Sequence, residues 1–176
     1  MDIIDFYRLE QKRIHDWMRR GISDLTPEEW HHTVEGSGNT IAFLVWHCAR
    51  TEDNILRFIL QGRPTIWVDG NWYERLGLPS RVQGTGMPTE EARAIHIADP
   101  KLFMEYVEEV WREFETYLAG ISDGGAELSK RIVTVKPLGD MSAIRVTGQV
   151  CISHLFIHYG EIALLRGTMG KRGLPL

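Results

Sequence analysis

Two histidines four residues apart form the first pair of side chains whose spacing suits chemistry. His154 and His158 lie in a stretch of helical periodicity, so both imidazoles are expected on one helix face, about one turn apart. That spacing suits two adjacent coordination positions on a single metal ion. The apolar stripe around them continues to Leu165, which predicts that both rings point toward the protein interior.

A third histidine occupies the interior stripe of another predicted helix. That stripe consists of Leu44, His47, Thr51, Ile55 and Phe58. A single interior histidine is best explained as a core residue hydrogen-bonded to a neighbour. Three buried neutral imidazoles without an ion, however, would need three separate sets of partners. The set His47, His154 and His158 therefore favours a metal site, with coordination positions left open for water or substrate.

Other side chains near these histidines have more than one interpretation. Glu161, three residues after His158, is a fourth ligand, a hydrogen-bond acceptor for an imidazole N–H, or a base acting on bound water. We favour the acceptor. Cys151 is more simply a small buried residue, and Cys48 points about 100° away from His47 around the helix. Four further histidines lack partners at ligand spacing: His15, His31, His32 and His96.

Four long helices are expected to position these residues. Apolar residues recur at helical spacing over 3–20, from about 39 to 61, over 100–119 and from about 147 to 168. A short capped turn is expected at 26–29. The pattern predicts an all-α fold, a four-helix bundle with a long crossover between helices two and three.

Two connections separate these helices. Residues 62–99 contain eight glycines and prolines, and only 89–94 appear helical there. A connection of this length usually signals a lid, a crossover or both. Trp67 and Trp72 within it either line a pocket above the metal or anchor the connection to the helices. The stretch 120–146 is ambiguous, because 131–135 fits a short strand and 137–140 is rich in turn residues.

Composition sets the broad class. The 176 residues fit one domain, 1–176, and 43% hydrophobic with 25% charged residues is ordinary for a soluble globular protein. The net charge of −4 gives no general attraction to nucleic acid. No apolar run reaches the roughly 18 residues of a membrane span, and the N-terminus does not resemble a secretion signal. Two cysteines are too few for a disulfide framework. We expect a cytoplasmic protein.

Three stretches resemble the DinB-like superfamily, which includes thiol-dependent transferases and isomerases. They are residues 40–53 (TIAFLVWHCARTED), the loop 67–87 with Trp72 and the run GTGM at 84–87, and the ending from HLFIHYGEI at 154–162 to 175. The resemblance implies that His47, His154 and His158 are the metal ligands. Many members have Gln at the position of Glu161. Members commonly dimerise through their helices, which implies a homodimer.

The resemblance implies a transferase that uses a low-molecular-weight thiol, with a small-molecule substrate. A divalent ion, zinc or nickel first, would lower the pKa of the thiol. In this hypothesis Glu161 orients water or a ligand imidazole, Trp67 and Trp72 shape an apolar pocket, and Arg166 binds a cofactor carboxylate. A solvent-facing Arg166 is the simpler alternative. A metal-dependent hydrolase with Glu161 as base, and a non-catalytic metal or small-ligand binding stress protein, remain open alternatives.

Overall fold

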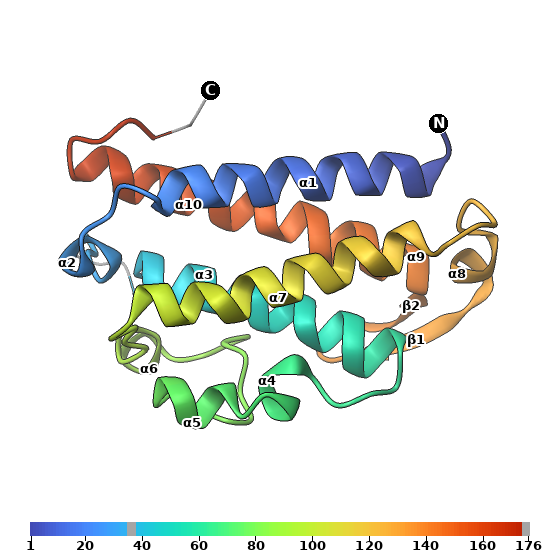
Figure 1. Ribbon diagram of the computed structural model, residues 1–176, viewed down its shortest axis with the longest axis horizontal. Coiled ribbons are helices and arrows are strands. Elements are labelled where there is room, and N and C mark those ends of the chain that lie inside the picture. Colours follow the sequence, from blue (N-terminus) through green and yellow to red (C-terminus); the bar gives the residue numbers. More distant parts are fainter. Residues whose placement is uncertain (35–37, 174–176) are drawn as a thin grey trace.

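The computed structural model describes residues 1–34 and 38–173, and four long helical segments make up most of it. They are α1 (Ile3–Ile22), α3 (Ile41–Asp53) continued by η1 (Asn54–Leu60), α7 (Pro100–Ala119), and α9 (Ala143–Gly148) continued by η2 (Gln149–Ser153) and α10 (His154–Thr168). The helices α1 and α3 each pack against both α7 and α10, so the four segments surround a shared interior (Figure 1). Within the described ranges, no helix has both the length and the apolarity to cross a membrane.

Side-chain caps fix where three of these helices begin. Asp2, Thr40 and Asp99 each accept a hydrogen bond from a backbone N–H in the first turn of α1, α3 and α7. These N–H groups have no partner inside the helix, so the caps set the start of each segment. The helices expected at 3–20 and 100–119 are confirmed, although α1 continues to Ile22.

Wide π turns interrupt the two segments that carry the histidines. In η1 the backbone hydrogen bonds join residues five positions apart, as between Gln61 N–H and the Leu56 carbonyl. The wider turn shifts the interior stripe from Ile55 to Leu60, which is 3% exposed. The prediction that Phe58 faces inward is therefore wrong, because its side chain is 60% exposed. The second π turn, η2, lies directly before His154.

The long connection between η1 and α7 is more helical than expected. It contains α4 (Ile66–Asp69) and α5 (Trp72–Leu76) in addition to the predicted α6 (Thr89–Arg93). The buried carboxylate of Asp53 accepts hydrogen bonds from the Ile66 and Trp67 backbone N–H groups, at 2.8 and 2.9 Å. A tertiary contact from α3 thus stabilises the start of α4, which local sequence does not reveal.

The fold is mostly helical, which confirms that part of the all-α prediction, and it contains a small antiparallel sheet in addition. Strands β1 (Ile132–Val135) and β2 (Gly139–Ser142) form a hairpin in which Val133 pairs with Met141. Val135 and Met141 are both 7% exposed and pack into the core with Phe114 and the end of η1. Burial of one strand face against helices stabilises a hairpin that would be marginal alone.

Three short helices complete the described chain. They are α2 (Pro27–Trp30), which follows its predicted Thr26 cap, α8 (Ala126–Lys130) before the hairpin, and α9, which starts the last segment at Ala143. That segment was expected to begin near Thr147. The hairpin ends at Ser142 and leads directly into α9.

Candidate metal centre

Three histidine side chains from α3 and α10 meet at one point. The Nε2 atom of His154 lies 3.2 Å from Nε2 of His47 and 2.9 Å from Nε2 of His158. One ligand atom from each ring falls within 4.8 Å of the other two. Among the described residues this is the one group of His, Cys, Asp and Glu with such geometry. The structure thus brings together the three ligands expected from spacing.

The separations between the nitrogens suit a small divalent ion. Around tetrahedral zinc, with Zn–N near 2.0–2.1 Å, neighbouring donor atoms lie about 3.3 Å apart. The 2.9 and 3.2 Å separations are close to that value, so small side-chain movements would complete the shell. Three imidazoles also suit nickel, copper or iron, and the donor set alone does not select among them.

Hydrogen bonds at the outer nitrogens fix the tautomers of two rings. Nδ1 of His47 bonds the backbone carbonyl of Gln83, and Nδ1 of His158 lies 2.8 Å from Oε1 of Glu161. Carbonyl and carboxylate oxygens only accept, so both Nδ1 atoms must carry the proton. In the neutral rings both Nε2 atoms are then unprotonated and present lone pairs toward His154. Convergent lone pairs repel one another unless a cation lies between them, which is the arrangement of a histidine metal shell.

Burial favours the neutral form of His47 and His154, and the neutral imidazole is the form that binds metal ions. Burial, followed by the neighbouring imidazoles, lowers the pKa of His154 to about 3. Burial also lowers the pKa of His47, and the Gln83 carbonyl opposes this shift. The hydrogen bond from His158 holds the pKa of Glu161 below its usual value, and a second bond from Asn39 at 2.7 Å acts in the same direction. Glu161 is therefore an ionised acceptor.

Gly84 allows the long connection to reach His47. Its φ is +95°, and a Cβ added there would lie 2.9 Å from Nδ1 of His47 and 3.0 Å from Cε2 of Phe43. The Phe43 ring is parallel to the His47 ring, and both rings border the space that this Cβ would occupy. The backbone at Gly84 therefore packs against both rings. Gly84 belongs to the run GTGM at 84–87, but the sequence alone predicts no role for it.

A cavity of about 300 Å³ lies beside His154 of the three-histidine group. Residues from α3, the long connection, the hairpin and the last helical segment line it, including Thr51, Gln83, Lys136, Leu138, Val150 and His154. The hairpin is thus part of the wall of the candidate site. Neighbouring residues in the sequence do not reveal that segments this far apart in the chain line one cavity. Thr51 is the exception, because it lies one turn after His47 on the predicted interior stripe.

A family comparison matches the DinB superfamily over residues 9–162. The chain belongs to the DinB superfamily. A crystal structure of a conserved protein from Enterococcus faecalis has the same fold as this DinB protein, with a TM-score of 0.82 at 20% identity, covering 97% of this chain and 99% of that one. A search of curated proteins finds no match.

The two tryptophans predicted to shape the pocket of this DinB protein do not line this cavity. Trp67 is fully buried, and its Nε1–H donates to the Pro79 carbonyl at 3.1 Å. Trp72 is 4% exposed and packs near Tyr106. These contacts fit the alternative interpretation, in which both side chains anchor the long connection.

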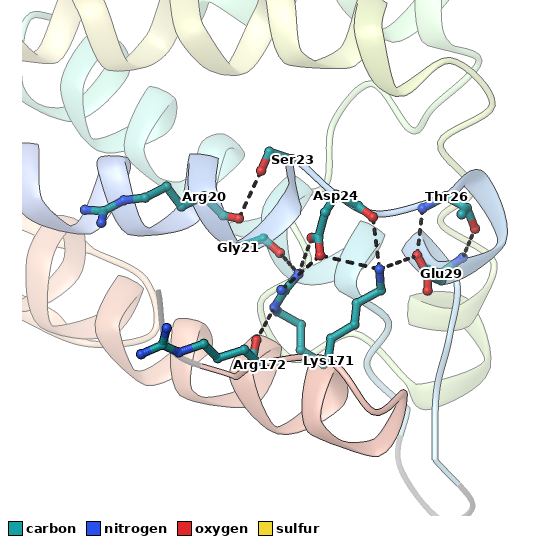
Figure 2. A network of polar contacts seen from close by, with 9 residues as sticks. Arg20, Gly21, Ser23, Asp24, Thr26, Glu29, Lys171 and Arg172 are labelled. Carbon is teal, nitrogen blue, oxygen red and sulfur yellow. Dashed lines mark hydrogen bonds and ion pairs between the residues drawn. The ribbon is translucent and has the colours of Figure 1, made fainter. Parts of the chain in front are cut away.

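Arg166 uses its guanidinium within the fold. It is buried and donates to the Asp24 carboxylate, the Gly21 carbonyl and the Arg172 carbonyl. The surrounding network is drawn in Figure 2, where Lys171 lies between Asp24 and Glu29. Arg166 thus ties the residues after α10 to the turn after α1, and it is not solvent-facing. Its role in binding a cofactor stays a prediction.

The other histidines of the DinB protein have separate partners. His15 is buried, stacks on Trp111 and lies 2.9 Å from the fully buried carboxylate of Glu52. His31 stacks on His96 and accepts a hydrogen bond from the Ile97 N–H, so it takes part in the fold. None of these residues belongs to the three-histidine group.

Proposed function

We propose that this DinB protein binds one divalent metal ion through His47, His154 and His158 and acts as a transferase with a low-molecular-weight thiol. The supporting observation is the convergence of three Nε2 atoms, two of them deprotonated because Gln83 and Glu161 bind the opposite ring nitrogens. We infer that the four packed helices form a four-helix bundle, a fold in which metal sites are built from facing helices.

Neutral ligands leave the charge of a bound ion uncompensated. Such an ion, zinc or nickel first, would favour the thiolate form of a thiol and so supply a nucleophile at neutral pH. The protein contributes three uncharged imidazoles and a cavity beside them in which the electrophilic substrate would lie. Within the described chain the group contains three histidines and no fourth ligand, which leaves positions for a thiol and a substrate.

The contacts of Glu161 favour this proposal over hydrolysis with Glu161 as base. Its Oε1 accepts from His158 and its Oε2 accepts from Asn39. A carboxylate held at both oxygens is suited to orienting a ligand imidazole rather than to taking a proton from water. We therefore assign Glu161 as a positioning residue for His158.

Metal analysis of the protein as isolated, followed by a thiol screen, tests the proposal. We expect about one metal ion per chain and turnover of an electrophile only when a thiol is present. Chelation and His158→Ala should each abolish turnover, whereas His96→Ala, which removes an exposed histidine outside the group, should not. Turnover without thiol would instead support a hydrolase. Stoichiometric metal without either activity would support the binding protein.

The expectations of a homodimer and a cytoplasmic location belong to the same proposal. Ile157 and Leu164, seven residues apart on α10, are 66% and 65% exposed and offer apolar surface for a second copy. Sedimentation of the metal-loaded protein tests the dimer, and fractionation of cells tests the location.

A further inference from the structure

The hydroxyl of Thr51 is buried without a hydrogen-bond partner among the described residues. Thr51 lies one turn after His47 on α3, is 4% exposed, and lines the cavity beside His154. A buried hydroxyl without a partner destabilises the folded state. A threonine inside a helix has an easy way to avoid this, which is a hydrogen bond to the carbonyl four residues earlier.

A second buried threonine in this chain takes that option. Thr147, which is 0% exposed, donates from Oγ1 to the Ala143 carbonyl at 3.0 Å. Thr51 does not make the equivalent bond to the His47 carbonyl, and its side chain lines the cavity. The difference between the two residues is the observation that points to a ligand.

The remaining lining indicates what kind of molecule fits. Ile55, Val135, Leu138, Val150 and Ile157 form apolar walls. Lys136 is the charged lining residue and lies exposed in the hairpin turn, and the uncharged polar lining residues are Thr51, Gln83, Thr85, Gln149, Ser153 and His154. A volume of about 300 Å³ suits a small molecule rather than a peptide. The lining thus favours a mainly apolar body that carries a polar group.

We propose that this cavity binds a small, mainly apolar carbonyl compound whose oxygen accepts a hydrogen bond from Thr51 Oγ1. This inference rests on the proposed function and deepens it, because it names the class of the electrophilic substrate. Thr51 and His154 both line the cavity, so a carbonyl held by Thr51 lies in the same space as one of the three proposed metal ligands. Thr51 is then a specificity-determining residue.

A pair of probes of equal shape tests the hydrogen bond. Benzylacetone carries a ketone, and isopentylbenzene has a CH–CH₃ group in its place. Binding of each is measured by NMR titration of the zinc-loaded protein and of the metal-free protein. We expect wild type to prefer the ketone. Thr51→Val, which keeps the shape of the side chain, should weaken ketone binding about 3- to 10-fold and leave the hydrocarbon unchanged or tighter.

Two further variants separate recognition from folding. Thr51→Ser keeps the hydroxyl and should keep the preference for the ketone. Thr147→Val removes an existing hydrogen bond, so its Tm should fall with no change in preference, whereas the Tm of Thr51→Val should stay level or rise. A preference that survives Thr51→Val, or no binding of either probe to wild type, overturns the inference. Failure of the thiol reaction alongside an intact ketone preference would count against the proposed function alone.

Discussion

Replacement of Gly84 by alanine is the sharpest test of how the metal centre is held. The new Cβ would lie 2.9 Å from Nδ1 of His47, where ordinary contacts begin near 3.4 Å. Movement of the loop toward Phe43 would not relieve this contact, because Cε2 of Phe43 lies only 3.0 Å from the same Cβ. The ring and the loop must therefore separate by roughly half an ångström, which is close to the tolerance of a metal site.

The magnitude follows from the hydrogen bond that this movement disturbs. Nδ1 of His47 is oriented by the Gln83 carbonyl, one residue before the substitution. Loss of such an orienting partner typically costs about 10- to 100-fold in metal affinity, or about 1.4 to 2.8 kcal/mol. We expect Gly84→Ala to weaken zinc binding by this factor, as measured by competition with a chromophoric chelator.

Gly86→Ala is the matched control. Gly86 also has a positive φ, +68°, but nothing lies within 4 Å of a Cβ added there. An alanine in either position costs about 1–2 kcal/mol of backbone strain, so both variants should lose stability. Only Gly84→Ala should lose zinc affinity beyond 3-fold or so. Equal zinc affinity in the two variants would refute the claim that Gly84 makes room for the His47 ring.

Three further predictions concern Glu161, His154 and Arg166. Glu161→Gln should weaken zinc binding about 10-fold by calorimetry, because a neutral amide orients the His158 ring less strongly; unchanged affinity would remove the carboxylate from the site. Folding lowers the pKa of the His154 imidazole from 6.5 to about 3. As pH falls, this imidazole is therefore protonated in the unfolded chain before it is protonated in the folded one. The metal-free protein should thus lose stability as pH falls from about 6.5 toward 3. In urea titrations at a series of pH values, the unfolding free energy of His154→Gln should depend less on pH than that of wild type. An equal pH dependence in the two proteins would contradict this assignment to His154. Arg166→Ala should cost about 2–3 kcal/mol of unfolding free energy, because Asp24 and two carbonyls lose their donor; a drop in zinc affinity without a loss of stability would instead favour a role at the site.

Local signals were sufficient to predict the four long helical segments and the three histidines that meet between them. Caps such as Thr40 and Asp99 act within one turn, so they are readable from neighbouring residues. The spacing of His154 and His158 is likewise a local property of one helix. To include His47 in the group, it was enough to predict which residues of a second helix face the interior, and that prediction is confirmed as far as Ile55.

The surroundings of the site depend on contacts between distant parts of the chain. The stripe fails at Phe58, because a π turn is not encoded by apolar spacing. The hairpin wall of the cavity and the bond from His47 to Gln83 join segments far apart in sequence. Trp67 fits an aromatic pocket or an anchored loop equally well until its partner, the Pro79 carbonyl, is located. Such pairings are tertiary properties.

The π turn η2 gives the segment that carries His154 and His158 about one residue more than a regular α-helix uses for the same rotation. Removal of one residue from Gln149–Ser153 would therefore be absorbed by relaxation to a regular α-helix, and both rings would still face His47. The arrangement of the three histidines should thus survive a single codon deletion in this turn, although the wide turn itself would disappear.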